Sequence, residues 1–310
     1  MQKQILVVGS INLDLVARVP RFPAPGETIS GTGFQTYPGG KGANQAVALG
    51  RLGAPVAMAG KLGDDIFAAR LRSSLQEAHV DTRYVTVAGG PSGTALIASS
   101  QSAENTIILV PGANALFLDP DVEYLREAIA NSAMVLAQLE IPLATVQTLG
   151  AMARAYEVPF ILDPAPAAAL ESQMLETVTW LTPNQTEAQI LLGLQPRDLT
   201  TQQAPEVAAR LLQAGARNVV LKMGSEGVYL LGEDTEAVQV PAFSVTAVDT
   251  TAAGDCFNGA FAYALAQRRL VPPEAARFAN AAAALSVTRL GAQTSMPTLQ
   301  EVEAFLASHS

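Results

Sequence analysis

The sequence predicts an α/β fold: a doubly wound, mostly parallel sheet with helices on both faces and a small β-sheet beside it as a lid. Three observations predict it. The opening run Ile5 to Gly9 is a short apolar stretch that ends at glycine, as a buried strand of a parallel sheet does. Short segments of alternating polarity follow that run. From Pro120 onward, strand-like and helix-like segments alternate regularly.

The composition fits one globular unit. The chain has 310 residues, 49% of them hydrophobic and 15% charged, which is enough for a substantial core. Because no low-complexity linker or repeat divides it, we expect a single domain over residues 1–310, with a lid formed by about 12–36 and 93–110. A net charge of −9 would repel nucleic acid and anionic membrane surfaces, so neither is an expected partner.

Targeting signals and cysteine usage favour a cytoplasmic protein. Residues 1–8 lack the length and basic lead of a signal peptide, and no apolar run approaches the roughly 20 residues of a membrane span. The single cysteine, Cys256, cannot form an internal disulfide, and with two histidines it is too little for a typical zinc site.

The first half of the chain is expected to form the lid around a core segment. Two hairpin-like pieces are predicted, one from Leu13–Val19 with Thr28–Phe34 and one from Thr94–Ser100 with Thr106–Val110. Pro20–Gly26 and Gln101–Asn105 would be their turns. Between the hairpins we expect a helix over 43–52, a strand over 55–61, and a helix over 66–78 that Asp64 or Asp65 caps.

The second half of the chain is expected to complete the sheet and its helices. Helices are predicted over 121–131, 143–156, 185–192 and 204–214, and strands over 133–139, 158–163, 178–182, 218–223, 227–231 and near 236–240. Ligands of such sheets bind beyond the carboxyl ends of the strands, where the connecting loops carry the chemistry.

The stretch Val248–Ala260, V-D-T-T-A-A-G-D-C-F-N-G-A, predicts an anion socket. A helix is expected to begin at Asp255, so the amides of Ala252, Ala253, Gly254 and Asp255 would point outward at the positive end of its dipole. A carboxylate beside a bound anion is costly unless it accepts a proton from an attacking hydroxyl. The pattern therefore suggests phosphoryl transfer to an alcohol. The alternative is that Asp255 only caps its helix.

Two common phosphate-binding signatures are absent from the sequence. The first strand runs into G-S-I-N-L-D, without the G-x-G-x-x-G of a dinucleotide fold. Gly39-Gly40-Lys41-Gly42 lacks both the earlier glycine and the following Ser/Thr of a P-loop. Neither a dehydrogenase nor a P-loop enzyme is supported.

Polar residues follow several of the predicted strands. Asn12 and Asp14 stand two apart, so in an extended segment they face the same way and could grip neighbouring hydroxyls. The run Gly39–Gln45 combines close backbone approach with the cation of Lys41 and the amide of Asn44. The alternatives are a turn residue, a solvated acid and a flexible surface loop. Glu140 stands at another strand end and Asn184 with Glu187 opens a helix, where capping is the alternative.

The ordered motifs together resemble one family. They are G-S-I-N-x-D, G-G-K-G-A-N-Q-A, Q-L-E-x-P, T-P-N-x-T-E, G-S-x-G-V, V-D-T-x-A-A-G-D and T-R-x-G-A-Q. This set, which runs from about Ile5 to Phe305, closely resembles the ribokinase branch of the PfkB carbohydrate kinase family. The resemblance implies ATP-dependent phosphorylation of D-ribose at O5, with Mg²⁺ arriving with ATP and K⁺ as an activator.

The resemblance also implies roles for matching residues. Asp255 resembles the catalytic base, and the amides of Ala252, Ala253, Gly254 and Asp255 resemble the anion hole. The implied ribose contacts are Asn12, Asp14, Gly40, Lys41, Gly42, Asn44, Glu140 and Asp255. The implied ATP contacts are Asn184, Glu187, Lys222, Gly224, Ser225, Gly227, Gly254 and Asn280. The implied monovalent-cation site involves Asp249, Thr251, Ser286, Arg289, Gly291 and Ser295, and the lid is implied to pair two subunits in a homodimer.

Three positions depart from the family pattern, and other functions compete. Cys256 and Lys222 stand where threonine is frequent, and Asn280 stands where some members have histidine. Other possible substrates are deoxyribose, fructose or a nucleoside, although the lid offers only Phe34, Tyr37 and Ile97 as an apolar wall for a base. A ribose-binding sensor without catalysis is the other alternative.

Overall fold

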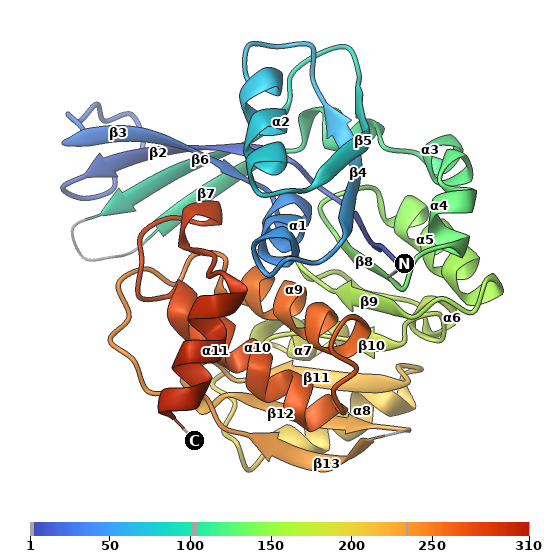
Figure 1. The fold of residues 1–310 in the computed structure, drawn as a ribbon. Helices are drawn as coiled ribbons and strands as arrows, with labels where there is room; N and C mark the ends of the chain where they lie inside the picture. Colours follow the sequence, from blue (N-terminus) through green and yellow to red (C-terminus); the bar gives the residue numbers. More distant parts are fainter. Residues whose placement is uncertain (1–2, 101–104, 234, 310) are drawn as a thin grey trace.

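The computed structural model describes residues 3–100, 105–233 and 235–309. Within these residues, the larger sheet confirms the predicted doubly wound α/β architecture (Figure 1). Its nine strands lie in the order β13 (Thr235–Val240), β12 (Val228–Gly232), β11 (Asn218–Lys222), β10 (Trp180–Leu181), β9 (Phe160–Asp163), β8 (Met134–Gln138), β1 (Ile5–Val8), β4 (Val56–Leu62) and β5 (Asp81–Val87). The strands from β11 to β5 are parallel, and β12 and β13 continue the sheet antiparallel.

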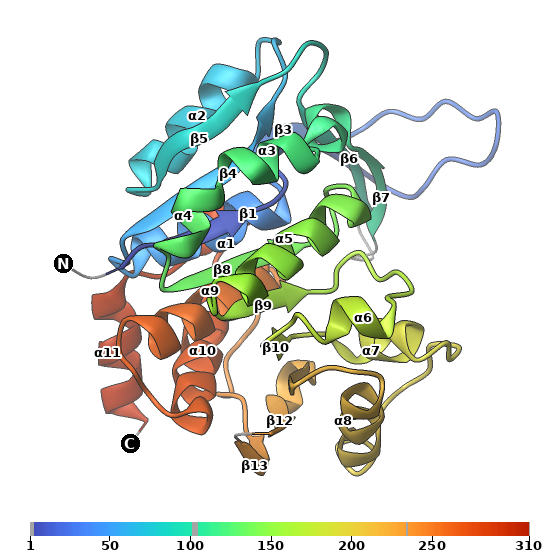
Figure 2. The same cartoon turned by 90° about the vertical axis from the view of Figure 1, so that its right-hand side faces the viewer.

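Both faces of this sheet are covered by helices. Ile5 and Val7 of β1 pack into one hydrophobic cluster, while Leu6 and Val8 pack into another. This explains why the strand is apolar at every position. The first cluster lies under α1 (Lys41–Arg51), α2 (Ala68–Glu77), α9 (Ala253–Ala266), α10 (Pro272–Ser286) and α11 (Leu299–Ser308). The second lies under α3 (Asp119–Tyr124), α4 (Arg126–Ala130), α5 (Leu143–Ala155), α6 (Ser172–Leu175), α7 (Gln185–Leu191) and α8 (Ala204–Gln213), several of which face the viewer in Figure 2.

The two predicted hairpins form one small sheet. Its order is β3 (Gly33–Gly39), β2 (Asn12–Val19), β6 (Gly93–Ser100) and β7 (Asn105–Val110). The pairs β2/β3 and β6/β7 are antiparallel, and β2 and β6 join them in parallel. This sheet projects to one side of the main body (Figure 1). Most of the expected turn at 101–105 lies outside the described residues.

The strand predicted over 28–34 is wrong. The strand β3 runs over Gly33–Gly39, with Arg18 opposite Gly33 and Asn12 opposite Gly39. Its sequence G-F-Q-T-Y-P-G contains glycine and proline, which argue against a strand in general. Proline is tolerated here because β3 is an edge strand, where a missing N–H breaks no ladder bond.

Other element boundaries also differ from the predictions. The helix predicted over 121–131 is broken at Leu125 into α3 and α4. The strand β5 and the helices α10 and α11 were not predicted from the sequence. By contrast, the predicted cap of α2 is confirmed, because Asp65 Oδ1 accepts the backbone N–H groups of Phe67 and Ala68. No helix in the described ranges is long and apolar enough to cross a membrane.

Candidate active site

Glu140 gathers three segments at the carboxyl edge of the sheet. It follows β8, and its Oε2 accepts hydrogen bonds from Ser10 Oγ, from Asn12 Nδ2 at 3.4 Å and from the backbone N–H of Lys41 at 3.2 Å. Asn12 Oδ1 accepts in turn from Asn114 Nδ2 at 2.7 Å. The amide of Asn12 is therefore held from both ends, and the predicted strand-end residues Asn12, Lys41 and Glu140 are brought together.

Glycines let the first turn of α1 press against this corner. Gly40 has φ +88°, and a Cβ there would lie 2.7 Å from the backbone nitrogen of Asn12. A Cβ on Gly42 would lie 2.8 Å from the carbonyl carbon of Gly9. Both distances are shorter than real Cβ contacts, so the close approach of α1 to the β1–β2 corner requires glycine.

Asp14 lies two residues along β2 from Asn12. A Cβ on Gly39 would lie 2.4 Å from Asp14 Oδ2, so the absence of a side chain at Gly39 makes room for this carboxylate. Burial raises the pKa of Asp14 to about 7, and the negative charges of Glu140 and Asp255 add to the rise. The carboxyl groups of Asp14, Glu140 and Asp255 therefore lie close enough to influence one another.

Asp255 is buried at the start of α9, where only 5% of its surface is exposed. Its Oδ2 accepts from Asn44 Nδ2 at 2.9 Å, and its Oδ1 accepts from Gln45 Nε2 at 3.2 Å. Both donors belong to α1, so the carboxylate is held across two helices and does not cap its own. Burial raises the pKa of Asp255 to about 6, while the ammonium of Lys41 opposes the rise.

The first turn of α9 presents fewer free amides than the sequence predicts. The helix begins at Ala253, one residue after Ala252, which has φ +59°. The N–H of Ala253 donates to the Thr250 carbonyl at 3.2 Å, so this amide is engaged. The N–H groups of Gly254 and Asp255 also lie in the first turn, where the helix itself supplies no acceptor. The socket is therefore centred on Gly254 and Asp255.

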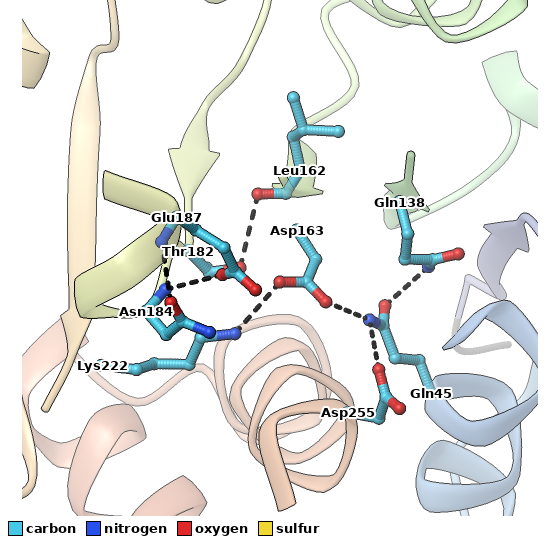
Figure 3. Close-up of polar contacts among 9 residues, drawn as sticks. All are labelled: Gln45, Gln138, Leu162, Asp163, Thr182, Asn184, Glu187, Lys222 and Asp255. Carbon is cyan, nitrogen blue, oxygen red and sulfur yellow. Dashed lines mark hydrogen bonds and ion pairs between the residues drawn. The ribbon is translucent and has the colours of Figure 1, made fainter. Parts of the chain in front are cut away.

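A pocket of about 460 Å³ opens in front of these amides. Two lysines, Lys41 and Lys222, line it, and Lys222 Nζ pairs with Asp163 Oδ1 at 3.0 Å (Figure 3). Burial alone would lower the pKa of Lys41, but the surrounding carboxylates of Asp255, Asp163 and Glu140 raise it. Two ammonium groups and a helix N-terminus make this pocket suited to an anion.

Asn184 and Glu187 form the opposite wall of that pocket. Glu187 N donates to Asn184 Oδ1 at 2.8 Å, and Asn184 N donates to Glu187 Oε2 at 2.7 Å, so the two residues form a capping box at α7 (Figure 3). The alternative role considered for Asn184 and Glu187, capping of the helix that they open, is therefore the one that their hydrogen bonds fulfil in this structure. Burial raises the pKa of Glu187, against the influence of Lys222.

The other predicted nucleotide residues are spread along one side. Gly224 lines the pocket, and Ser225 is exposed beside it. Gly227 has φ +87°, and a Cβ there would lie 2.2 Å from the Val240 carbonyl oxygen, so its position is a backbone requirement. Asn280 is buried, and its Nδ2 donates to the carbonyls of Val240 at 3.1 Å and Pro241 at 3.0 Å. Its amide therefore fixes the end of β13.

The residues of the predicted monovalent-cation site lie on two adjacent segments. Asp249 accepts the N–H of Thr251 through Oδ1 and the N–H of Gly291 through Oδ2, both at 2.9 Å. The remaining members point elsewhere: Arg289 pairs with Glu301, and the hydroxyls of Ser286 and Ser295 donate to nearby carbonyls. Within the described ranges, no cluster of three or more His, Cys, Asp and Glu residues could hold a metal ion.

A second pocket, of about 750 Å³, lies beneath the small sheet. Asp14, Tyr37 and Ile97 line it from the small sheet, and Asp249 and Thr250 line it from the main body. Thr250 lines the anion pocket as well, so the two pockets adjoin near the start of α9.

Sequence reasoning missed five residues that organise the site: Ser10, Gln45, Asn114, Gln138 and Asp163. Asp163 could have been found, because it ends an apolar strand just as Glu140 follows one. Gln45 stood inside the quoted G-G-K-G-A-N-Q-A motif. Nothing in the sequence pattern indicated that Asn114 would support Asn12.

The chain is similar to known carbohydrate kinases over nearly its whole length. Residues 2–299 match the pfkB family of carbohydrate kinases. Ribokinases of Haemophilus influenzae and Bacillus subtilis are 41% and 42% identical over 307 residues, covering 99% and 98% of this chain and 99% and 100% of theirs. A deoxyribokinase of Salmonella typhi is 36% identical and covers 98% of each chain. The structure of Arabidopsis thaliana ribokinase complexed with ribose and ATP is 34% identical and covers 99% of each chain, with a TM-score of 0.89. The chain belongs to the PfkB family of carbohydrate kinases.

Proposed function

We propose that this protein is a ribokinase, which transfers the γ-phosphoryl group of ATP to O5 of D-ribose. One observation carries the proposal. The buried carboxylate of Asp255 is held by Asn44 and Gln45 in the wall of an anion pocket, which adjoins a second pocket at Thr250. The sequence relatives named above are ribokinases and a deoxyribokinase, which supports a pentose as the acceptor.

The sugar would bind beneath the small sheet. Asn12, Asp14 and Glu140 offer carboxylate and amide groups to its hydroxyls, and Lys41 offers an ammonium. Asn44 Oδ1 is buried and has no hydrogen-bond partner among the described residues, while the Nδ2 of the same amide donates to Asp255. A buried acceptor without a donor is costly, and a sugar hydroxyl would satisfy it.

Catalysis would combine one base with fixed positive charge. Asp255 accepts the proton of the sugar's 5-hydroxyl as that oxygen attacks the γ-phosphorus. Because phosphoryl transition states are loose, the carboxylate chiefly orients the hydroxyl and accepts its proton late. The amides of Gly254 and Asp255, with the dipole of α9, stabilise charge on the transferring group, and Lys41 and Lys222 add to this field.

ATP would lie along the pocket lined by Asn184, Glu187, Lys222 and Gly224. Ser225 and Gly227 belong to the turn at its edge, and Asn280 supports the neighbouring end of β13. Mg²⁺ would arrive with the phosphates, because the carboxylates of Asp163 and Glu187 face this pocket but form no closed set of ligands. When bound, Mg²⁺ would neutralise phosphate charge.

A monovalent cation, K⁺, would order the segment that carries the amides. The segments 248–251 and 286–291 are joined by hydrogen bonds from Val248 N and Asp249 N to the Val287 carbonyl and from Gly291 N to Asp249 Oδ2. Thr251, Ser286, Arg289 and Ser295 lie along these segments or follow them. Backbone carbonyls of these two segments would supply the oxygen ligands that such an ion needs.

The small sheet would act as a lid and as the interface of a homodimer, within one kinase domain over residues 1–310. On the face away from the sugar pocket it exposes Phe34 by 66%, Leu96 by 43% and Ile108 by 59%. Leu96 and Ile108 are directly paired across β6 and β7. Exposed apolar neighbours of this kind are typical of protein interfaces. We expect the dimer to act in the cytoplasm, where ATP is available.

A substrate panel tests the proposal. ATP consumption is measured with ribose, deoxyribose, fructose and adenosine, in K⁺ and again in Na⁺. The proposal expects ribose to give the highest kcat/KM, and K⁺ to give faster turnover than Na⁺. Faster turnover with deoxyribose would show that the protein is a deoxyribokinase. This alternative is included because one relative, from Salmonella typhi, is a deoxyribokinase. Tight ribose binding without ATP consumption would indicate a sensor.

A further inference from the structure

Two buried carboxylates share one side-chain amide at the centre of the site. Gln45 Nε2 donates to Asp163 Oδ2 at 3.1 Å and to Asp255 Oδ1 at 3.2 Å (Figure 3). Gln45 is fully buried, and Asp163 and Asp255 are 2% and 5% exposed. Since each hydrogen of the amide bonds one acid, the amide fixes the two carboxylates relative to each other.

The orientation of that amide is fixed from its other end. Gln138, the last residue of β8, donates its Nε2 to Gln45 Oε1 at 2.7 Å. If the amide of Gln45 turned over, its oxygen would face two carboxylates and its nitrogen would face the donor of Gln138. The arrangement in Figure 3 is therefore the one that gives both carboxylates a donor and the Gln138 amide group an acceptor, while Gln138 Oε1 has no hydrogen-bond partner among the described residues.

The other oxygen of Asp163 reaches the anion pocket. Asp163 Oδ1 accepts from Lys222 Nζ at 3.0 Å, and the two side chains are 3% and 13% exposed. A Cβ on Gly254 would lie only 3.4 Å from Lys222 Nζ, so the ammonium stands beside the first turn of α9. A buried partner holds a lysine that would otherwise sample many rotamers.

We propose that Asp163 is a positioning residue that couples the two halves of the transfer. It holds the ammonium of Lys222 toward the transferring phosphate, and through Gln45 it aims the carboxylate of Asp255 at the attacking hydroxyl. The inference rests on the proposed function, because it takes Asp255 as the base and Lys222 as a phosphate contact. Asp163 acts through these two neighbours and does not itself touch the reacting atoms.

Because of the charged and polar groups around Asp255, two substitutions should shift the pKa of its carboxyl in opposite directions. The groups that face Asp255 are Lys41 from α1, which lowers its pKa, and Asp163 from β9, which raises it; Asp14 from β2 interacts with the same carboxylate. Asp163→Asn removes a negative charge, which lowers the pKa of Asp255. The acid limb of the pH profile, which is the fall of kcat/KM at low pH, therefore moves to lower pH. Gln45→Met removes a donor that stabilises the carboxylate, so the limb moves to higher pH.

The experiment measures kcat and both KM values from pH 5 to 9 with ATP and ribose. The variants are Asp163→Asn, Gln45→Met, Lys222→Met and the double variant Asp163→Asn/Lys222→Met. We expect Asp163→Asn to raise the KM for ATP roughly tenfold, as loss of a charged hydrogen bond would. In the Lys222→Met background the same change should leave KM nearly unaltered. Asp65→Asn, a carboxylate that binds Ser92 and the start of α2, should move neither KM nor the acid limb.

Three results would overturn the inference. The first is an Asp163→Asn variant whose KM for ATP and low-pH fall in kcat/KM are both those of the wild type. The second is an equal effect of Asp163→Asn on the KM for ATP with and without Lys222. The third is a shift of the low-pH fall in kcat/KM in the same direction for Asp163→Asn and Gln45→Met. Should Asp163→Asn fail to fold in a melting experiment, Gln45→Met decides alone, and an unmoved limb overturns the inference. The wild type and Asp255→Asn separate the two proposals: if the wild type does not phosphorylate ribose, the proposed function fails. If Asp255→Asn turns over normally, its role as base fails, and if only Asp255→Asn is inactive, the role of Asp163 fails.

Discussion

At the scale of single residues, the site is built from acids that the protein buries at a cost. Asp14, Asp163 and Asp255 lie in one polar centre, and burial raises the pKa of Asp14 and of Asp255. Amides and ammonium groups hold two of them, as described above. A cluster of this kind is expected where function outweighs stability.

Asp14 is predicted to lower stability at alkaline pH. Its pKa in the folded chain is about 7, above the ordinary value of 3.8, so its stabilising contribution is complete below pH 3.8 and is lost as the pH rises through 7. An asparagine cannot ionise. Asp14→Asn should therefore raise the melting temperature more at pH 8 than at pH 5, while the KM for ribose rises roughly tenfold. A stability difference that is equal at both pH values, or an unchanged KM, would contradict this account of Asp14.

The sequence allowed some of these residues to be predicted and not others. Strand-end position identified Glu140, and the small residues before a helix identified Asp255. Both signals are local. The links through Gln45 and Gln138 join residues that are 93 positions apart, and only the packed sheet brings them together. Three-dimensional partners of this kind leave no periodicity in a single sequence.

At the scale of elements, glycine sets how closely α1 approaches the β1–β2 corner. Gly40 and Gly53 both have positive φ, +88° and +80°, at the two ends of that helix. A Cβ on Gly40 would meet the backbone of Asn12 at 2.7 Å, whereas a Cβ on Gly53 would meet nothing within 4 Å. The two positions share the same backbone requirement but differ in contact with the site.

Gly40→Ala and Gly53→Ala are therefore a matched pair. Gly53→Ala should lower the free energy of unfolding by about 1–2 kcal/mol, because alanine is strained at positive φ, and Gly40→Ala should lower it by more, because its Cβ would also meet the backbone of Asn12. Only Gly40→Ala should also weaken ribose binding, by tenfold or more, because it moves α1 away from Asn12. Ribose titration calorimetry and denaturant unfolding measure the two effects. Equal loss of ribose affinity in both variants would show that the close contact does not matter.

Element prediction succeeded where one pattern dominated. Central parallel strands such as β1 and β8 are almost entirely apolar because both faces of the sheet are covered, and they were found, whereas the parallel edge strand β5 alternates and was missed. The strand β3 was misplaced because its edge position tolerates a proline and two glycines, which an interior strand would exclude. Whether a strand lies at an edge depends on the whole sheet and cannot be read from the strand itself.

At the scale of the whole molecule, the small sheet is the part that projects from the main body and leaves one apolar face uncovered. One of its faces covers the pocket of about 750 Å³ that we propose for the sugar, and the other exposes Phe34, Leu96 and Ile108. The two predicted hairpins form one continuous four-stranded sheet, and its role as a lid is a proposal. Its pairing with a second subunit remains a proposal that the exposed apolar face supports.

Ile108→Lys tests that pairing. A charge at the centre of an apolar interface should be costly, so this variant should sediment as a monomer where the wild type sediments as a dimer. Ile66→Lys is the control, because Ile66 is 88% exposed near α2, outside the small sheet. It should leave the mass unchanged. A dimer that survives Ile108→Lys would place the interface elsewhere.

The central claim, that Asp255 is the base, is tested most directly by Asp255→Asn. Ribose binding is measured by calorimetry, and ribose 5-phosphate formation from ATP is measured on the same preparation. The account predicts that the variant folds and binds ribose while kcat falls on the order of a hundredfold to ten-thousandfold. Formation of ribose 5-phosphate at the wild-type rate by the folded variant would contradict it.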